Sequence, residues 1–183
     1  MRFRTIALLA AGFAAGLAIW FGFREPYERP LAAAAQTLLR VFERPPVTTL
    51  QAKSGEVLVD RSDFPPDSPR PGLPAEDIHF NFVLLTALFA LQPRFFEGKS
   101  LLRLFAAAAL LCFVHVAALV FQVESVYATR LGDWSALNYG LVARNLWAGG
   151  FHFYLVAGRF AAPFVLWWLL ARKDVSESRG WGR

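Results

Sequence analysis

The sequence predicts an all-α membrane protein with four transmembrane helices and a small extracytoplasmic β-hairpin. Hydrophobic residues make up 56% of the 183 residues and are gathered into long uncharged runs, without the period of 2 or 3.6 typical of amphipathic elements. Residues 101–123 carry no charge after Arg103, and about twenty residues at ~1.5 Å each can cross a hydrocarbon core of roughly 30 Å. Two short segments with the composition of β-strands flank a glycine between the first two apolar runs.

Residues 1–23 are predicted to form an N-terminal transmembrane anchor. Arg2 and Arg4 precede an uncharged run of about nineteen residues, which is longer than the apolar part of an ordinary signal peptide. The run ends in the bulky sequence IWFGF without a small-x-small cleavage pattern. The sequence therefore favours a retained anchor over a cleaved signal peptide.

Residues 24–77 are expected to form an extracytoplasmic segment with three parts. Leucines and a phenylalanine alternate with polar residues over 30–43, which predicts a short interfacial helix with Pro30 in its first turn. Segments 47–52 and 56–61 flank Lys53-Ser54-Gly55 and predict a β-hairpin. Five prolines lie between Asp63 and Asp77, so a Pro-rich linker without a core of its own should follow. Two strands alone are marginal, so the hairpin should pack on another part of the chain or on a partner.

Three further regions complete the prediction. Apolar runs at 78–93 and 101–123, joined by RFFEGKS, predict a transmembrane helical hairpin over 78–123. Residues 124–149 mix tryptophan and tyrosine with polar side chains, as expected of an interfacial extracytoplasmic segment. Residues 150–172 should form the fourth transmembrane helix, interrupted by Arg159 and Pro163, and 173–183 a cytoplasmic tail.

The basic residues predict orientation. The positive-inside rule places both termini in the cytoplasm and the chain in a bacterial inner (cytoplasmic) membrane. The basic residues on that side are Arg2, Arg4, Arg94, Lys99, Arg103, Arg172, Lys173, Arg179 and Arg183.

Composition argues against several classes of function. The net charge of +5 is not concentrated on one amphipathic element, so no nucleic-acid partner is expected, whereas contact with the lipid bilayer is. The single cysteine cannot form an intramolecular disulfide. There is no HExxH or CxxC pattern, and Pro93 occupies the position of the first glycine of a GxxxxGK phosphate loop. No catalytic, cofactor-binding or metal-binding residue, and no cofactor, is therefore assigned.

The strongest polar pattern lies in the last apolar run. Asn145, His152 and Arg159 are spaced by seven, so a continuous helix would place all three on one stripe. A charge at this depth is costly and often faces a bundle interior, where it could hold a ligand or partner anion. In the alternative, Arg159 snorkels to lipid headgroups.

A second polar stripe lies on the predicted helix at 101–123. Cys112, His115 and Gln122 share one helix face, which should point toward protein. Interhelical hydrogen bonding or packing is one reading of Cys112 and His115. A metal site and thiol catalysis are the others, although two ligands do not make a zinc site.

Two weaker signals remain. His79 and Asn81 flank the start of the second run, near the expected level of Arg144, and predict either an outer polar cluster or capping and headgroup contacts. Gly12 and Gly16 are spaced as GxxxG and would permit close helix packing.

Four segments carry a resemblance to a known group: AIWFGF at 18–23, SGEVLVD at 54–60, HFNF at 79–82 and FVLWWLL at 164–170. In layout the chain resembles the small membrane proteins associated with exosortases, in particular the exosortase H type. The resemblance implies a non-enzymatic accessory whose membrane partner is an exosortase-like, protein-sorting transpeptidase. The alternatives are an intramembrane thiol enzyme using Cys112 and His115, and a small transporter or lipid-binding subunit in which His152 and Arg159 hold an anion.

Overall fold

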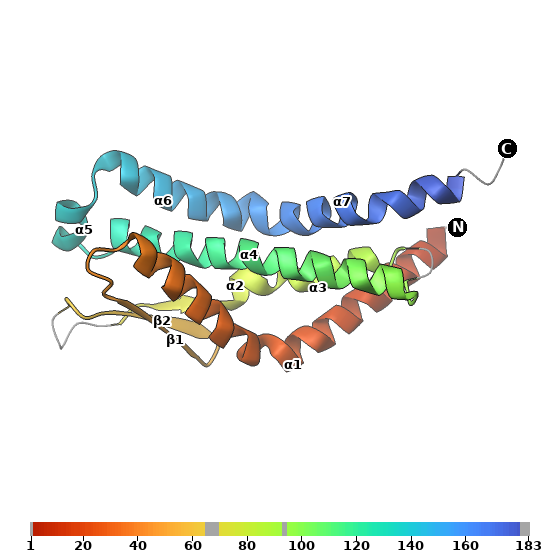
Figure 1. Cartoon of the computed structure of the whole chain (residues 1–183), viewed down its shortest axis with the longest axis horizontal. Helices are drawn as coiled ribbons and strands as arrows, with labels where there is room; N and C mark the ends of the chain where they lie inside the picture. The colour runs from red at the N-terminus through yellow and green to blue at the C-terminus, as the bar shows by residue number, and fades with distance from the viewer. Residues whose placement is uncertain (1, 65–69, 93–94, 180–183) are drawn as a thin grey trace. The chain divides into compact units, whose positions relative to one another are not determined.

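The computed structural model describes residues 2–64, 70–92 and 95–179 (Figure 1). By contact clustering the chain forms two compact units. Unit 1 contains Met1–Gly22, Phe80–Phe113 and Arg159–Arg183, and unit 2 contains Phe23–His79 and Val114–Gly158. In chain order the elements are α1 (Arg2–Phe42), β1 (Thr48–Lys53), β2 (Glu56–Arg61), β3 (Gly72–Pro74), α2 (Glu76–His79), α3 (Asn81–Phe89), α4 (Gly98–Thr129), α5 (Asp133–Asn138), α6 (Leu141–Phe153), the π-helical segment η1 (Tyr154–Gly158) and α7 (Arg159–Arg179).

Three helices in the described ranges are long and apolar enough to cross a membrane: Phe3–Phe42, Gly98–Thr129 and Leu141–Ala171. The expectation of a mostly helical chain with helices able to cross a membrane is thus confirmed. The predicted second span is not among these three helices. Its helical part, α3, has nine residues, or about 13.5 Å at 1.5 Å per residue, which is less than half of a hydrocarbon core.

The anchor and the interfacial helix expected at 30–43 belong to one helix, α1, of 41 residues with Pro26 and Pro30 inside it. Each proline removes one backbone hydrogen bond from the helix, at a cost of about 3 kcal/mol. Burial offsets this cost, because Leu31, Ala35 and Leu39 are each at most 2% exposed in the core of unit 2.

Unit 1 is built from helices, with α3 buried among them. Val83, Leu85 and Phe89 of α3 are fully buried. The GxxxG pair faces this helix: a Cβ added at Gly12 would lie 2.5 Å from Ala90 Cβ, and one at Gly16 would lie 1.9 Å from Thr86 Oγ1. The small residues therefore let α1 approach α3 closely. Large apolar side chains are exposed on the outside of unit 1, among them Phe3, Ile6, Phe13, Phe105, Phe113, Phe160, Phe164 and Trp168.

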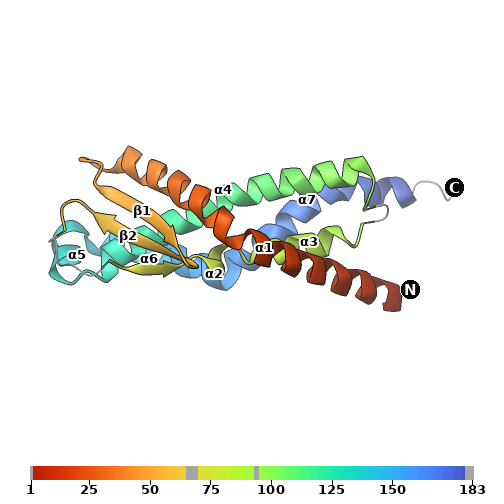
Figure 2. The same ribbon diagram turned by 90° about the horizontal axis from the view of Figure 1, so that it is seen from below.

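Within unit 1, the start of α1, the start of α4 and the end of α7 lie toward the same end (Figures 1 and 2). The end of α3 lies there too, before α4 begins. The chain thus leaves this end of the unit in α1 and α4 and returns to it in α3 and α7.

Unit 2 is organised around a three-stranded antiparallel sheet in the order β1-β2-β3. Lys53 pairs with Glu56 across a two-residue turn in which Ser54 and Gly55 have φ of 52° and 84°, as in a type I′ hairpin. The predicted hairpin is therefore present. The linker was expected to lack a core, yet Gly72–Pro74 forms the third strand, where Leu73 is 3% exposed.

One face of this sheet packs against α1 and α4. Val57 and Val59 of β2 are fully buried in a cluster that also contains Leu39, Leu119 and Tyr127. The hairpin thus packs on its own chain, one of the two supports expected for it. The packing of the sheet on α4 also explains why the second half of α4 is apolar, because Leu119, Val123 and Val126 cover the sheet.

A π-helical segment separates α6 from α7. The stripe proposed for Asn145, His152 and Arg159 requires 3.6 residues per turn throughout. Because π-helical residues 154–158 lie between His152 and Arg159, that spacing argument fails at this point.

Candidate functional site

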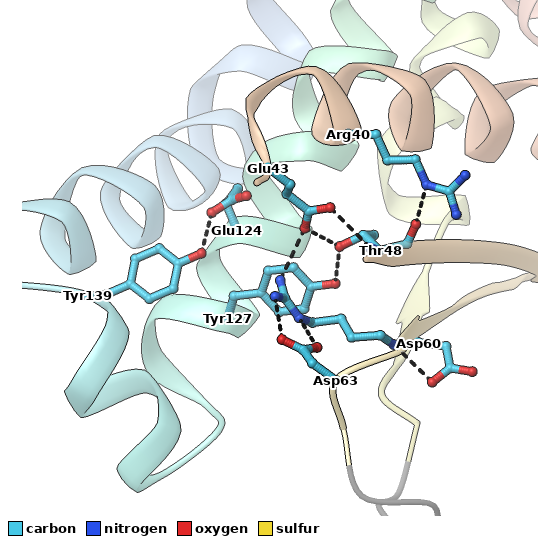
Figure 3. Close-up of polar contacts among 9 residues, drawn as sticks. Arg40, Glu43, Thr48, Asp60, Asp63, Glu124, Tyr127 and Tyr139 are labelled. Atoms are coloured by element: carbon cyan, nitrogen blue, oxygen red, sulfur yellow. Dashed lines mark hydrogen bonds and ion pairs between the residues drawn. The ribbon is translucent and has the colours of Figure 1, made fainter. Parts of the chain in front are cut away.

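A group of interlocked polar side chains, the Arg61 cluster, joins the helices of unit 2 to its sheet. It consists of Glu43, Thr48, Arg61, Asp63 and Tyr127, and Figure 3 labels all of these except Arg61. The Glu43 carboxylate accepts hydrogen bonds from the Thr48 backbone N–H at 3.0 Å, from the Thr48 hydroxyl and from Arg61 Nη1 at 3.1 Å. The Thr48 hydroxyl also lies 2.8 Å from the Tyr127 hydroxyl. The cluster therefore connects the end of α1 to β1, β2 and α4.

The guanidinium of Arg61 is held from all sides. It forms two hydrogen bonds with Asp63, Nε to Oδ1 and Nη2 to Oδ2, each 2.9 Å long. Its Cζ lies 4.9 Å from the ring centroids of both Tyr127 and Trp134, within the range of a cation–π interaction. The hydrogen bonds from Arg61 lower the pKa of Asp63 below its ordinary value. These contacts immobilise Arg61, so the cluster has a structural role: it holds the sheet of unit 2 on its helices.

Beside this cluster, Tyr139 donates its hydroxyl hydrogen to Glu124 at 2.7 Å. Burial and this carboxylate together raise the pKa of the Tyr139 hydroxyl. Tyr139 therefore stays protonated, and its hydrogen bond holds the segment after α5 against α4.

The histidine cluster of unit 2 contains Tyr27, Glu28, His79 and His115. The Tyr27 hydroxyl lies 2.8 Å from His115 Nδ1, and the Tyr27 ring lies edge-on to both histidine rings, with centroids 5.5 and 5.9 Å away. Glu28 Oε1 lies 3.4 Å from His79 Nε2, and both residues are 1% exposed. Both histidines therefore contact Tyr27.

The other predicted residues are dispersed. Cys112 is a half-buried free thiol of unit 1, and Asn81, 5% exposed, belongs to the same unit. Arg159 lies at the start of α7, with its guanidinium carbon 4.8 Å from the Phe160 ring centroid. Gln122 is 4% exposed, as its predicted inward stripe requires.

Three predicted residues lie on α6, and Arg144 does not point into a common site with the other two. Its Nε donates to the Tyr139 carbonyl oxygen at 3.0 Å, so it closes the turn before α6. Asn145 and His152 are exposed.

A groove follows the outer edge of β1. It has a volume of about 480 Å³ and is lined by Arg29 and Gln36 of α1 and by Leu50, Ala52 and Lys53 of β1. Side chains of α1 cover the first half of this edge: Arg40 donates to the Thr48 carbonyl oxygen, and Gln36 accepts from the Leu50 N–H at 2.7 Å.

Among the described residues, no side chain bonds to the second half of the β1 edge in this way. Thr48 and Leu50 direct their N–H groups away from β2, and Ala52, two residues further along the strand, does the same. In the part of the chain that the structure describes, no strand lies beyond β1. Backbone donors and acceptors at Ala52 are thus presented to the groove.

The residues missed by the sequence reasoning are Tyr27, Glu28, Glu43, Arg61 and Tyr127. A signal for Arg61 was available, because the strand alternation that buries Val57 and Val59 places residue 61 on the same inward face. An arginine at an inward position requires partners.

The described residues contain no group of three or more His, Cys, Asp or Glu side chains arranged to hold a metal ion. Comparisons with models of protein families, with curated proteins and with solved structures found no match to this chain.

Proposed function

We propose that this protein is a non-enzymatic, integral inner-membrane accessory that binds a membrane protein through the open half of its β1 edge. The bound segment is an extended, acidic stretch of the partner, which adds to the sheet as a fourth strand. The observation that carries this proposal is the backbone of Ala52 beside two cationic side chains, Arg29 and Lys53.

Hydrogen bonding and charge support this mode of binding. An exposed strand edge binds an extended peptide through main-chain hydrogen bonds, and neighbouring pockets select its side chains. Arg29 and Lys53 form no ion pair with any described residue. An acidic segment would neutralise both.

The polar clusters support an accessory role over catalysis. Arg61 is enclosed by carboxylates and aromatic rings, and His115 lies against the Tyr27 hydroxyl. These contacts fix the sheet on the helices, so the β1 edge is presented by a rigid support. The layout resemblance makes an exosortase-type transpeptidase the first partner to test.

Photo-crosslinking in native membranes tests the proposal. A photoreactive residue replaces the exposed Gln51 of β1, and a control places it at Leu137 of α5, which is 86% exposed. We expect Gln51 to label an acidic, extended segment of a membrane protein that Leu137 does not label. Identical products from both positions, or a mapped segment that is basic or helical, would overturn the docking mode.

Replacement of the Cys112 thiol distinguishes a non-enzymatic accessory role from thiol catalysis. Cys112→Ala should leave the Gln51 crosslink and the activity of the partner system unchanged. Loss of that activity with the crosslink retained would favour the enzyme.

The proposal includes four membrane crossings with both termini in the cytoplasm. The arrangement of unit 1 supports this topology, since the start of α1 and the end of α7 lie toward the same end. The short helix α3 and its flanking residues would then make the second crossing, shielded from lipid by other parts of unit 1. Reporter fusions at Gly55 and at the C-terminus should report opposite compartments, and the same compartment would overturn the topology.

A further inference from the structure

Three side chains, two from α1 and one from the residue that follows it, take the place of a neighbouring strand along the first half of β1. Gln36 Oε1 accepts a hydrogen bond from the Leu50 N–H at 2.7 Å. Arg40 Nε donates to the Thr48 carbonyl oxygen at 2.7 Å, and Glu43 Oε2 accepts from the Thr48 N–H at 3.0 Å (Figure 3). These are the outward backbone groups that another strand would bind.

The helical repeat explains how these side chains reach successive groups of the strand. Gln36, Arg40 and Glu43 are spaced by four and three, so they lie on one helix face and each step advances about 4.5–6 Å along the axis. The Glu43 N–H donates to the Leu39 carbonyl oxygen at 3.1 Å, so the helical repeat extends to Glu43. Outward-directed residues of a strand recur about every 6.6–6.8 Å. Because the two repeats are similar, each step along the helix meets the next outward residue of β1.

The next step on this helix face brings alanines to the strand. Ala32 and Ala33 precede Gln36 by four and three positions, and both line the groove together with Ala52. Ala32 is 2% exposed in the core of unit 2, whereas Ala33 is exposed. A methyl group neither donates nor accepts a hydrogen bond, so the series of polar side chains is interrupted at the level of Ala52. This interruption leaves the second half of the β1 edge open.

The two faces of β1 determine which side chains a bound segment presents. The side chains of Leu50 and Ala52 are buried or half-buried, whereas those of Gln51 and Lys53 are exposed on the other face. A strand added at the edge alternates in step with β1. Its residue opposite Ala52 therefore faces Ala33, where an apolar side chain fits. The adjacent residue of the segment lies on the same face as Lys53, where a carboxylate fits.

We propose that Ala33 and Lys53 select the bound segment, which carries an apolar residue opposite Ala52 and, directly next to it, an acidic residue beside Lys53. Gln36 limits the pairing in the other direction, because it occupies the Leu50 N–H. The inference rests on the proposed docking at the β1 edge, since the selected segment is the one bound there.

Residue-resolved hydrogen exchange of the full-length protein in micelles tests the interruption without a partner. Ala33→Gln continues the polar series and supplies a carbonyl oxygen for the Ala52 N–H. We expect exchange of this amide to slow about two- to tenfold, as one added hydrogen bond requires. The control, Ala34→Gln, changes an exposed residue about 100° further around the helix and should leave this rate unchanged. Equal rates in Ala33→Gln and the unmodified chain would overturn the role of Ala33.

Photo-crosslinking from Gln51 in native membranes tests the selection itself. Ala33→Gln should lower the yield of labelled partner severalfold, whereas Ala34→Gln should retain it. Lys53→Gln should lower the yield about two- to fivefold through the loss of one cross-strand charge pair, and Lys53→Arg should retain it. Unfolding midpoints of all four variants are measured in parallel, and the Lys53 variants test the inference even where an Ala33 variant is destabilised.

The outcomes separate the selection from the docking. Absence of a labelled partner from Gln51 in the unmodified chain would overturn the docking. A labelled partner whose yield is unchanged by Ala33→Gln and by Lys53→Gln, at unchanged midpoints, would leave the docking in place and overturn the selection. A mapped segment in which no acidic residue adjoins an apolar one would also overturn the selection.

Discussion

Glu43 Oε1 and Arg61 Nη1 lie 3.1 Å apart, and each of the two side chains is only 11% exposed. Glu43 directly follows α1, whereas Arg61 is the last residue of β2. The pair therefore fastens the end of the long helix to the middle strand of the sheet. Because both charges are largely removed from water, each depends on the other for compensation.

Removing the arginine should destabilise unit 2 strongly. Arg61→Met leaves Glu43 and Asp63 without their cation, and we expect a loss of about 3–5 kcal/mol in the free energy of unfolding. Chemical unfolding in detergent micelles measures this change. The control is Arg70→Met, which breaks an ion pair with Asp60 in which the side chains are 57% and 36% exposed, and should cost about 1 kcal/mol or less. Equal losses of unfolding free energy in both variants would show that the Arg61 cluster does not hold the sheet on the helices.

The Arg61–Asp63 contact also predicts a pH dependence. Asp63 has a pKa below its ordinary value of 3.8 in the folded chain, so its contribution to stability is complete above that value and is lost as the pH falls through the folded pKa. Asp63→Asn should lower the unfolding midpoint at pH 6. The difference from the unmodified protein should shrink below about pH 4. A difference that stays constant from pH 6 to pH 3 would contradict the ion pair.

The hairpin could be predicted because its information is local. Strand-forming residues flank Ser54-Gly55, and a two-residue turn with positive φ needs such residues. The third strand could not be predicted in this way, since Gly72–Pro74 is held by pairing with β2, a contact distant in sequence. The same limit explains α1: the sequence predicts an anchor over 1–23 and a separate helix over 30–43, whereas burial of Leu31 and Leu39 keeps one continuous helix.

The same difference between local patterns and contacts distant in sequence applies to the candidate site. Helix periodicity correctly predicted that His115 and Gln122 face protein, since one is fully buried and the other 4% exposed. Periodicity could not identify Tyr27 as the partner of His115, because the two residues are 88 positions apart. The β1 groove depends on how α1 lies along the strand, which no local pattern encodes.

Close packing of α1 on α3 predicts an asymmetry between two glycines of one helix. A Cβ at Gly12 would lie 2.5 Å from Ala90 Cβ and 3.0 Å from the Ala87 Cα, whereas one at Gly22 meets nothing within 4 Å. Gly12→Leu should therefore cost about 1–3 kcal/mol through overpacking. Gly22→Leu, the matched control, should be neutral or stabilising because leucine favours the helix more than glycine does. Unfolding midpoints in micelles measure both, and equal midpoints would contradict the contact with α3.

The two sides of strand β1 allow docking to be separated from folding. Ala52 directs its N–H toward the groove, whereas the N–H of Gln51 faces β2, where Gln51 pairs with Leu58. Proline has no N–H, and edge strands accept it where that N–H faces outward. Ala52→Pro should therefore keep the unfolding midpoint within a few degrees while removing the donor that a fourth strand needs.

The measurement combines unfolding with crosslinking. To keep Gln51 available for mutation, the photoreactive residue is placed at the exposed Ala33 of α1, which also lines the groove. Ala52→Pro should lose most of the crosslinked partner at an unchanged midpoint, whereas Gln51→Pro should lose both the partner and several degrees of stability, because it breaks a β1–β2 hydrogen bond. A folded Ala52→Pro variant that still crosslinks fully would show that the partner binds elsewhere on unit 2, since strand addition at this edge requires the Ala52 N–H.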